Sequence, residues 1–410
     1  RTYYSLPFKP KEYIFSDYKK AQIKLRDLLE ESVSKRLVSD VPIGAFLSGG
    51  IDSSIITALA SKHASNLNTF SIGYKDEPLF DETRYAKLVA DKYKTNHTAF
   101  ELKNDDLYQQ MHKVLEYTDE PFADSSSLAV NILSMYTRKK ATVALSGDGA
   151  DEIFSGYNKH MAEFLVRERS LQNRIVSAGK PLWKALPKSR NSKIGNLSRQ
   201  LLKFADGMKK GNKERYWDWA GILKDEQAAS LIKNGNPKRF QIDKKEILHP
   251  ELEMNDFNGV LFQDVNQVLV SDMLTKVDMN SMNNSLEVRV PFLDHHVVEF
   301  AFKIPQEFKI RKGIKKRILQ ETFKDELPPE LFNRPKHGFE VPLLKWFRGE
   351  LSDEIQKTYL NRDFIEEQKI FNWHNISDLI KKLSSKNPED SAASIWAFIV
   401  FQHWWKKWYN

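Results

Sequence analysis

VPIGAFLSGGIDSS, residues 41–54, is the stretch that decides the fold. Its first part, 41–47, is short, apolar and bounded by proline and glycine, which predicts a buried strand. A Ser-Gly-Gly turn then leads into a predicted helix over 51–62. Two glycines let the backbone approach a ligand closely, and the free N–H groups at a helix start favour an anion. The stretch therefore predicts a strand–turn–helix unit that cradles phosphate, with the hydroxyl donors Ser48, Ser53 and Ser54.

The residues around this unit repeat the alternation of strand and helix. Further strands are predicted over 68–74, 97–102 and 140–149, and helices over 16–37, 81–94 and 105–118. Strands and helices that alternate at this interval predict an α/β fold, with a parallel sheet and helices on both faces. After about residue 155 the pattern becomes mostly helical, so we expect a largely helical C-terminal part.

Composition narrows the classes of protein to which the chain can belong. The 410 residues contain 41% hydrophobic and 29% charged residues, as in ordinary globular proteins. No apolar run is long enough to span a membrane. The complete lack of cysteine excludes disulfides, thiolate metal sites and a cysteine nucleophile within these residues. A cytoplasmic location is the expectation that follows.

The net charge of +8 is concentrated in one segment. Residues 167–215 carry fourteen Lys or Arg against three Asp or Glu. Such a segment could contact nucleic acid or another polyanion. No RNA-binding motif accompanies it, so a solvated helical surface is the favoured interpretation, and a nucleic-acid partner is not expected.

Two familiar nucleotide-binding motifs come close in this sequence and fail. Residues 44–49 have the glycine spacing of a P-loop, but Gly50 stands where the lysine must be. The G-x-G at 147–149 begins a dinucleotide fingerprint, but Glu152 occupies the third glycine position. A different phosphate site is therefore required.

A carboxylate in the first turn, Asp52, indicates what that site holds. A negative charge beside phosphate is repulsive unless a divalent cation lies between them. Mg²⁺ takes one or two carboxylates together with phosphate oxygens. Asp52 is thus predicted to be a metal ligand in an enzyme that holds pyrophosphate. The alternative is an ordinary first-turn residue favoured by the helix dipole.

A second turn of the same kind supports the metal interpretation. ALSGDGADEIFSGY, residues 144–157, again ends a strand in Ser-Gly and continues with Asp148, Asp151 and Glu152. The carboxyl ends of strands in one parallel sheet face a common crevice. One carboxylate from each turn is therefore predicted to clamp the same cation.

Taken together, these motifs resemble a known family. S-G-G-x-D-S is the signature of the PP-loop (HUP-like) ATP pyrophosphatases, and the chain resembles the synthetase domain of class B, glutamine-hydrolysing asparagine synthetases from about residue 3 to 347. The other motifs that carry the resemblance are DEPFADSSS (119–127), SGDGADEIFSGY (146–157), DMNSMNNSLEVRVPFLD (278–294), KKRILQETF (315–323) and LPPELFNRPKHGFEVP (327–342). The resemblance implies a ligase that uses ATP and Mg²⁺ to adenylate the side-chain carboxylate of aspartate, releases pyrophosphate and passes the acyl group to ammonia.

The resemblance also implies roles for individual residues. Asp148 matches a carboxylate, often Glu, that is important for forming the acyl-adenylate and handling ammonia. Lys316 matches a lysine that stabilises charge on the phosphate during adenylation. Asp52 and Asp151 match the ligands of the Mg²⁺–pyrophosphate. The positions that match ATP contacts are Leu47, Ser48, Gly49, Gly50, Asp52, Ser53, Ser54, Ile72, Ser146 and Gly147.

Substrate binding is predicted for Glu287, Arg289 and Asp294 of the LEVRVPFLD segment. An arginine there could hold an anionic substrate with two hydrogen bonds. A structural ion pair is the alternative, and the sequence leaves both open.

Four parts are expected along the chain: a linker remnant at 1–15, a nucleotide-binding α/β core at 16–160, a basic, mostly helical segment at 161–255, and a helical part at 256–410 that completes the active site. The first residues, RTYYSLPFKPKEY, lack a starting Met and an apolar signal-peptide core. We therefore expect a piece of a longer protein. The resemblance implies that the N-terminal glutaminase domain of full-length members, with its nucleophilic cysteine, is missing from these residues. Ammonia would then come from solution, or from a separate glutaminase domain or subunit.

The sequence departs from the family pattern at several positions, and alternative functions remain open. Asp148 is one methylene shorter than Glu, Ser155 interrupts a usual Gly-Gly, and Gln320 replaces an expected arginine. The same adenylation could serve a sugar-acid amidotransferase or a cyclase that makes a lactam or isopeptide. A tRNA-modifying PP-loop enzyme and a non-catalytic, partner-binding relic are less favoured.

Two further expectations concern the lysine motif and the last motif. Lys315 and Lys316 are predicted to lie about 100° apart on one helix, whose buried face carries Ile314, Ile318, Leu319 and Phe323. Residues 333–342 combine two prolines, a glycine and a basic cluster, which is typical of a loop that closes on anionic ligands.

Overall fold

The structure is a computed structural model that describes residues 3–75, 81–168, 171–188, 193–248, 256–332, 341–349 and 351–409. Its described residues form two compact units, each assembled from separate stretches of the chain. Unit 1 comprises Arg1–Tyr117, Ser126–Met161 and Asp256–Val341, and unit 2 comprises Thr118–Ser125, Ala162–Asn255 and Pro342–Asn410. Most of the closing loop expected at 333–342 falls on residues 333–340, which lie outside the described residues.

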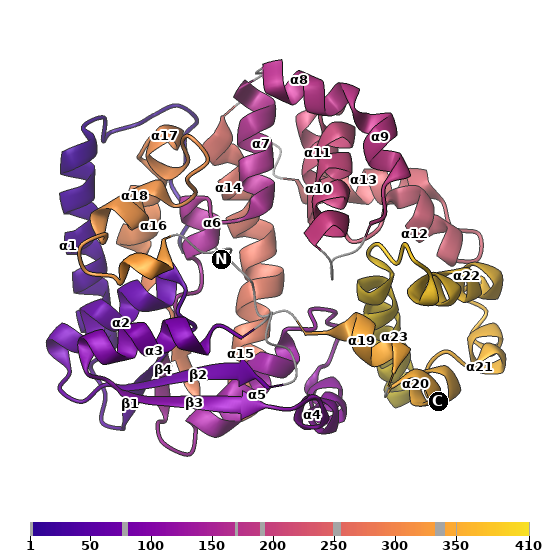
Figure 1. Ribbon diagram of the computed structural model, residues 1–410, viewed down its shortest axis with the longest axis horizontal. Helices are drawn as coiled ribbons and strands as arrows, with labels where there is room; N and C mark the ends of the chain where they lie inside the picture. Colours follow the sequence, from indigo (N-terminus) through magenta and orange to yellow (C-terminus); the bar gives the residue numbers. More distant parts are fainter. Residues whose placement is uncertain are drawn as a thin grey trace. The chain divides into compact units, whose positions relative to one another are not determined.

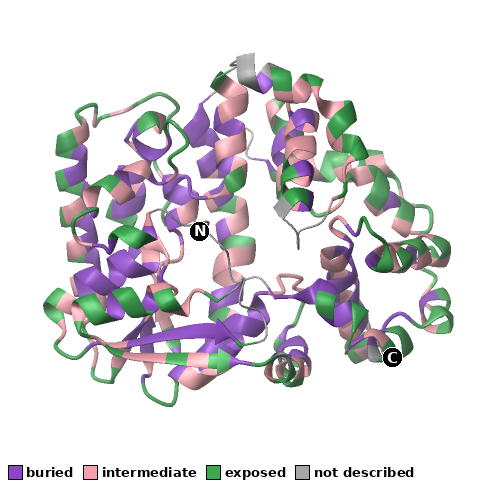
Figure 2. Ribbon diagram, in the orientation of Figure 1, coloured by how far each residue is buried: buried purple, intermediate pink, exposed green. Residues whose placement is uncertain are grey.

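Unit 1 is built on a five-stranded sheet whose neighbouring strands, in the described residues, all pair in parallel. The strand order is β3-β2-β1-β4-β5. The strands are β1 (Ile43–Phe46), β2 (Asn68–Tyr74), β3 (Asn96–Leu102), β4 (Val143–Leu145) and β5 (Glu287–Arg289). β1 and β4, in the middle of the sheet, are largely buried, whereas the edge strand β3 is partly exposed (Figure 2). The predicted α/β fold with a parallel sheet is confirmed.

Helices connect and cover these strands (Figure 1). α2 (Ile51–His63) packs against β1, and α3 (Thr83–Tyr93) packs against β2 and β3. α4 (Asn104–Tyr117) and α5 (Ser127–Thr137) pack against each other, and α5 contacts β2. Figure 1 shows α2 and α3 on one side of the strands and α5 on the other, as right-handed connections in a parallel sheet require.

The first helix, α1 (Tyr18–Arg36), shows why the N-terminal helical prediction was accurate. The Asp17 carboxylate accepts a hydrogen bond from the backbone N–H of Lys20 and caps the helix. Apolar residues at helical spacing are buried on one face: Ala21, Leu25, Leu28, Leu29 and Val33. This face packs against α2, α16 (His295–Phe302) and α18 (Arg317–Thr322).

The chain returns to unit 1 after a long helical excursion. The elements before and after it are α6 (Ala150–Phe154), α7 (Asn158–Glu168), α14 (Phe257–Asp264), the π-helix η1 (Val265–Leu274), α15 (Thr275–Met282), the 3₁₀-helices η2 (Pro291–Leu293) and η3 (Pro329–Leu331), and α17 (Gln306–Lys309). The expected C-terminal part, 256–410, is thus divided between the two units. Residues 256–341 belong to unit 1, which contains the sheet, and residues 342–410 belong to unit 2.

Residues 3–15, expected as a linker remnant, pack against unit 1. The Tyr13 hydroxyl donates to both carboxylate oxygens of Asp256, at 2.9 and 2.8 Å. The Phe8 ring stacks on Phe262 with centroids 5.0 Å apart. These contacts hold the segment on the surface of the unit, where each of residues 3–15 is exposed or half-buried.

Unit 2 is helical in its described residues. Its helices are α8 (Leu171–Ala178), α9 (Lys180–Ala185), α10 (Lys193–Gly207), α11 (Asn212–Ala220), α12 (Asp225–Leu231), α13 (Pro237–Ile247), α19 (Leu343–Arg348), α20 (Ser352–Thr358), α21 (Arg362–Glu367), α22 (Trp373–Ser384) and α23 (Ser391–Tyr409). The aromatic-rich C-terminal stretch forms α23, which buries Trp396 and Phe398. No helix among the described residues is both long and apolar enough to cross a membrane.

Much of the basic charge of residues 167–215 is paired within unit 2. The buried Arg215 guanidinium lies 2.7 Å from Glu163, and Asp390 pairs with both Arg199 and Lys203 at 3.4 Å. The other pairs include Lys180–Asp206, Lys210–Asp218 and Arg167–Glu163. A paired cation offers little to a polyanion, so the segment's charge does not by itself mark a nucleic-acid surface.

Ser155, at the C-terminal end of α6, occupies a backbone position that suits glycine. Its φ is 66°, in the left-handed region that side chains with a Cβ rarely adopt. The residue is fully buried, and its hydroxyl has no hydrogen-bond partner among the described residues. Both features cost free energy of folding.

We therefore expect Ser155→Gly to raise the free energy of unfolding by about 1 kcal/mol or more. Ser155→Ala removes the hydroxyl but keeps the Cβ, so the difference between the two variants isolates the backbone contribution. Urea unfolding of both variants measures it. An alanine variant as stable as the glycine variant would show that Ser155 is not strained.

Candidate active site

The two Ser-Gly turns meet at the carboxyl ends of β1 and β4. A Cβ on Gly147 would lie 2.9 Å from both Asp52 Cβ and Ser53 N, so only glycine permits this approach. Ser146 N donates to Arg289 O at 2.9 Å, which ties the second turn to β5. The two turns therefore lie together at one edge of the sheet, as the sequence predicts.

The first turn is held by hydrogen bonds among its own serines. Ser48 N donates to Ser53 Oγ at 3.2 Å, and the two hydroxyls lie 3.1 Å apart. Gly50 N donates to Ser48 Oγ at 3.3 Å. Gly49 has a φ of 73°, and a Cβ there would lie 2.5 Å from Ala86 N at the start of α3. The turn is thus preshaped before any ligand is bound.

The residues predicted to contact the nucleotide lie at the ends of neighbouring strands. Leu47, fully buried, follows β1 and donates its N–H to Phe70 O at 2.7 Å. Ile72, 7% exposed, lies near the end of β2. Ser54, in the first turn of α2, is fully buried.

Lys316 lies between the two predicted metal ligands. Its Nζ is 2.5 Å from Asp52 Oδ2 and 2.6 Å from Asp151 Oδ1. Burial opposes the charged form of this lysine, but the attraction of Asp151 and Asp52 outweighs it and raises the Lys316 pKa above its ordinary value. The ammonium is therefore charged and joins the first helical turns of α2 and α6.

The predicted placement of this lysine on a helix is wrong. α18 begins at Arg317, and Lys316 precedes it with a left-handed backbone, φ 49°. Ile318, Leu319 and Phe323 are buried as expected, but Ile314 is 42% exposed. A turn rather than helical phase separates the lysines, and Lys315 Nζ donates to Asn158 Oδ1 at 2.7 Å.

The carboxylates fit a divalent cation. Asp52 Oδ1 is buried and accepts no hydrogen bond from any described residue, although a carboxylate oxygen in that position requires a partner. Asp151 lies in the first turn of α6, in the facing turn. Asp52 and Asp151 together offer the oxygen ligands that Mg²⁺ prefers.

Gly156 is a residue that our sequence reasoning missed. A Cβ at this position would lie 1.6 Å from Asp151 Oδ1 and 2.1 Å from Lys316 Cε. The glycine thus leaves the space that the ion pair fills. Its place in the SGDGADEIFSGY motif was the available signal.

Asp148 lies in the second turn, and the charge of a buried lysine acts on it. Ser146 Oγ donates a short hydrogen bond to its carboxylate. Burial raises the Asp148 pKa, while Ser146 and the Lys276 ammonium oppose the shift. Lys276, 8% exposed on α15, was also missed, although it stands two residues before the DMNSMNNSLEVRVPFLD motif.

A buried polar network lies behind the carboxylates. Tyr157 Oη donates to Glu152 Oε1 at 2.5 Å. His160 Nε2 lies 2.6 Å from Asp264 Oδ2, and Lys159 Nζ lies 2.8 Å from Asp264 Oδ1. Burial opposes ionisation of Asp264, but Lys159 and His160 lower its pKa to about 2. The network supports α6 from the side of α14.

The three predicted substrate residues are engaged in contacts of their own. Arg289 Nε lies 2.6 Å from Glu287 Oε1, and its Nη1 donates to the carbonyls of Arg36 and Val38 at 2.9 and 2.7 Å. These contacts match the structural alternative raised for the arginine. A substrate role for Arg289 and Glu287 remains a prediction.

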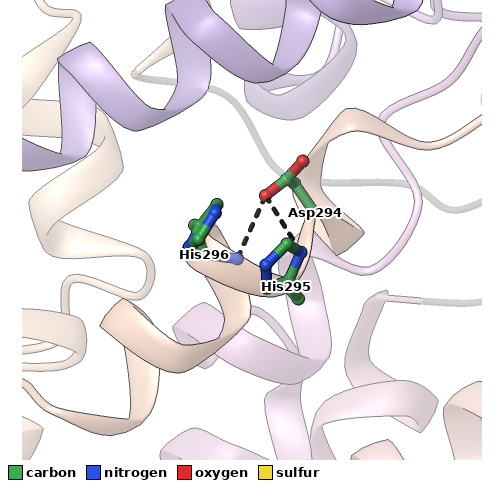
Figure 3. Close-up of side chains that lie close together, drawn as sticks. All are labelled: Asp294, His295 and His296. Carbon is green, nitrogen blue, oxygen red and sulfur yellow. Dashed lines mark hydrogen bonds and ion pairs between the residues drawn. The ribbon is translucent and has the colours of Figure 1, made fainter. Parts of the chain in front are cut away.

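Asp294 caps α16 and lies beside two histidines (Figure 3). Its Oδ1 accepts from His296 N at 3.0 Å, and its Oδ2 pairs with Arg36 at 3.1 Å. His295 Nδ1 lies 3.8 Å from Oδ1. The side-chain ligand atoms of the three residues are close enough for one metal ion. The positive Arg36 on the carboxylate opposes such a use.

Glu152 gives the site a measurable pH dependence. It is 1% exposed, and burial together with repulsion from Asp151 raises its pKa to about 7 from an ordinary 4.5. A carboxyl whose pKa is raised by folding binds more protons in the folded state between these values. Its contribution is therefore present at low pH and is lost as pH rises through 7.

We expect the free energy of unfolding to fall by about 3 kcal/mol between pH 4.5 and 8 because of this group. Glu152→Gln keeps the acceptor for Tyr157 and removes the titration, so it should be the more stable protein at pH 8 and similar at pH 5. Urea unfolding in EDTA measures this. Glu101→Gln, on the exposed edge strand, is the control, and the same pH slope in all three proteins would contradict the assignment.

Comparison with known proteins places the chain in a family. Residues 24–406 match the profile of the family described as asparagine synthase. The chain is 30% identical over 411 residues to asparagine synthetase [glutamine-hydrolyzing] 1 of Bacillus subtilis (strain 168), covering 98% of the chain and 62% of that relative. It is 38% identical over 298 residues to a putative asparagine synthetase [glutamine-hydrolyzing] 2 of Methanocaldococcus jannaschii, covering 71% of the chain and 54% of the relative.

A more distant relative carries a different name. Amidase chyE of Penicillium rubens is 20% identical over 398 residues, which cover 88% of the chain and 58% of the relative. The chain spans less than two thirds of the length of each of these relatives. The match to the family profile extends over nearly the whole sequence, and the chain therefore belongs to the asparagine synthase family.

Proposed function

We propose that this chain is an ATP-dependent, amide-forming carbon–nitrogen ligase that converts aspartate and ammonia to asparagine. The observation that carries the proposal is the pair of Ser-Gly turns whose carboxylates, Asp52 and Asp151, meet around the Lys316 ammonium. Turns of this kind suit a pyrophosphate that leaves as one unit. The family match supports the same chemistry.

In the proposed reaction an oxygen of the aspartate side chain attacks the α-phosphorus of ATP. The bond to the bridging oxygen breaks and pyrophosphate leaves. Ammonia then attacks the acyl carbon, the bond to AMP breaks, and the nitrogen loses a proton. Mg²⁺, bound by Asp52 and Asp151, would neutralise charge on the pyrophosphate.

The chain's own groups are proposed to act at defined points. Backbone N–H groups and hydroxyls of residues 48–54 bind the pyrophosphate, and Lys316 stabilises the charge that builds on the phosphate oxygens. Asp148, whose pKa is raised by burial, accepts the proton lost by the nitrogen.

The acceptor, the nitrogen source and the location are the finer parts of this proposal. The alternative acceptor is another carboxylate, the substrate of a sugar-acid amidotransferase or of a cyclase, because 30% identity to asparagine synthetases does not fix the acceptor. Ammonia would be supplied from solution or by a glutaminase domain or subunit, because residues 1–410 contain no cysteine to act on glutamine. The absence of cysteine also supports a cytoplasmic location.

The purified chain should convert ATP to AMP and pyrophosphate when Mg²⁺ and aspartate are present, and form amide with ammonium but not with glutamine. Pyrophosphate release over a panel of carboxylates, with and without ammonium, identifies the acceptor. Asp52→Asn and Asp151→Asn should each abolish most of this turnover because they remove the predicted metal ligands. Formation of ADP and phosphate would rule out the reaction class.

Lys316→Ala should slow adenylation by roughly 10²-fold or more, because its charge stabilises the negative charge that builds on the phosphate oxygens in the transition state. Lys315→Ala is the matched control, since Lys315 bonds Asn158 rather than the carboxylates. Pre-steady-state pyrophosphate release measures both. An equal loss in the two variants would contradict the role of Lys316.

A further inference from the structure

We propose that Lys316 has a second role: its ammonium fills the cation position between Asp52 and Asp151 and keeps free divalent metal out until nucleotide arrives. This inference rests on the proposed function for the identity of the site. It concerns the order in which the site is filled, which the adenylation role of the lysine does not address.

The geometry places the ammonium where a shared metal would act. Nζ lies within 2.6 Å of one oxygen from each carboxylate, and the lysine is 5% exposed. Mg²⁺ bound to the same oxygens would stand about 2.1 Å from each. Two cations cannot share that space, because like charges at such separations repel strongly. A metal that bridges the two carboxylates through these oxygens would therefore bind only after the ammonium leaves, whereas Asp52 Oδ1, which the ammonium does not contact, offers a single ligand.

Residues around Lys316 fix the position of its backbone and side chain. Lys316 holds a left-handed backbone that a residue with a side chain adopts at a cost. Gln320 fixes the turn, since its backbone N–H donates to Lys316 O at 2.9 Å and its side chain donates to Lys315 O at 2.6 Å. Gly156 clears the path of the side chain. Gln320, where an arginine was expected, thus has a structural use in this chain.

Nucleotide supplies what the ammonium needs in order to move. The phosphates bring negative charge that can replace the carboxylates as its partner. The freed carboxylates then accept the cation that accompanies ATP. Free metal alone brings positive charge and offers the lysine no such partner. The site should consequently bind metal weakly by itself and strongly with nucleotide.

Binding of Mn²⁺ without nucleotide tests this, measured by titration with electron paramagnetic resonance. Lys316→Met should bind Mn²⁺ about tenfold or more tighter than the wild type, because the wild-type site accepts metal only in the fraction of molecules whose ammonium has left. Lys316→Gln, whose amide can still donate to the carboxylates, keeps the site folded and should behave in the same way. Lys316→Arg and Lys315→Met should bind like the wild type. Adding Asp52→Asn to Lys316→Gln should remove the gain.

An affinity in Lys316→Met and Lys316→Gln no greater than that of the wild type would overturn the proposal. An equal gain in Lys315→Met would also overturn it, because the gain would then reflect net charge alone. Pyrophosphate release by the wild type is scored separately. If the wild type releases pyrophosphate but the Lys316 variants bind Mn²⁺ no tighter, only the exclusion of metal fails. If the gain appears without pyrophosphate release, the proposed function fails and the exclusion of metal stands.

Discussion

The contact of one ammonium with two carboxylates is the interaction on which this site depends. Asp52 lies in the first turn of α2, Asp151 lies in the first turn of α6, and Lys316 precedes α18, so three segments far apart in the sequence meet at Nζ. Two carboxylates this close would repel each other without a cation. The arrangement of the turns therefore requires positive charge at their centre whether or not a ligand is present.

Much of the fold could be predicted because its signals are local. The run 41–54 predicts a strand, turn and helix from hydrophobicity and glycine alone, and the structure has β1 and α2 there. β5 was not predicted as a strand, because three residues within LEVRVPFLD carry no periodicity that separates strand from loop. Its strand character comes from pairing with β4, a contact that local patterns do not encode.

The candidate site was predictable in its carboxylates and less so in its geometry. Asp52 follows β1 and Asp151 follows β4. The carboxyl ends of parallel strands lie at the same edge of a sheet, so the topology brings the two residues together. Lys316 departs from helical phase because its left-handed backbone depends on contacts with Gln320 and with the two carboxylates. The space at Gly156 could not be predicted either, since it becomes apparent only when the atoms of Asp151 and Lys316 are in place.

The pairing of β5 with β4 has a consequence for how the chain folds. Val143 of β4 pairs with Glu287 of β5, and residues 162–255, which form helices of unit 2, are synthesised after the first strand and before the second. During synthesis from the N-terminus, β4 must wait with one open edge until the distant strand emerges. Contacts of such long sequence separation form slowly, and an unpaired edge invites association with other chains. We expect completion of the sheet, rather than formation of the early helices, to limit the rate at which this protein becomes native.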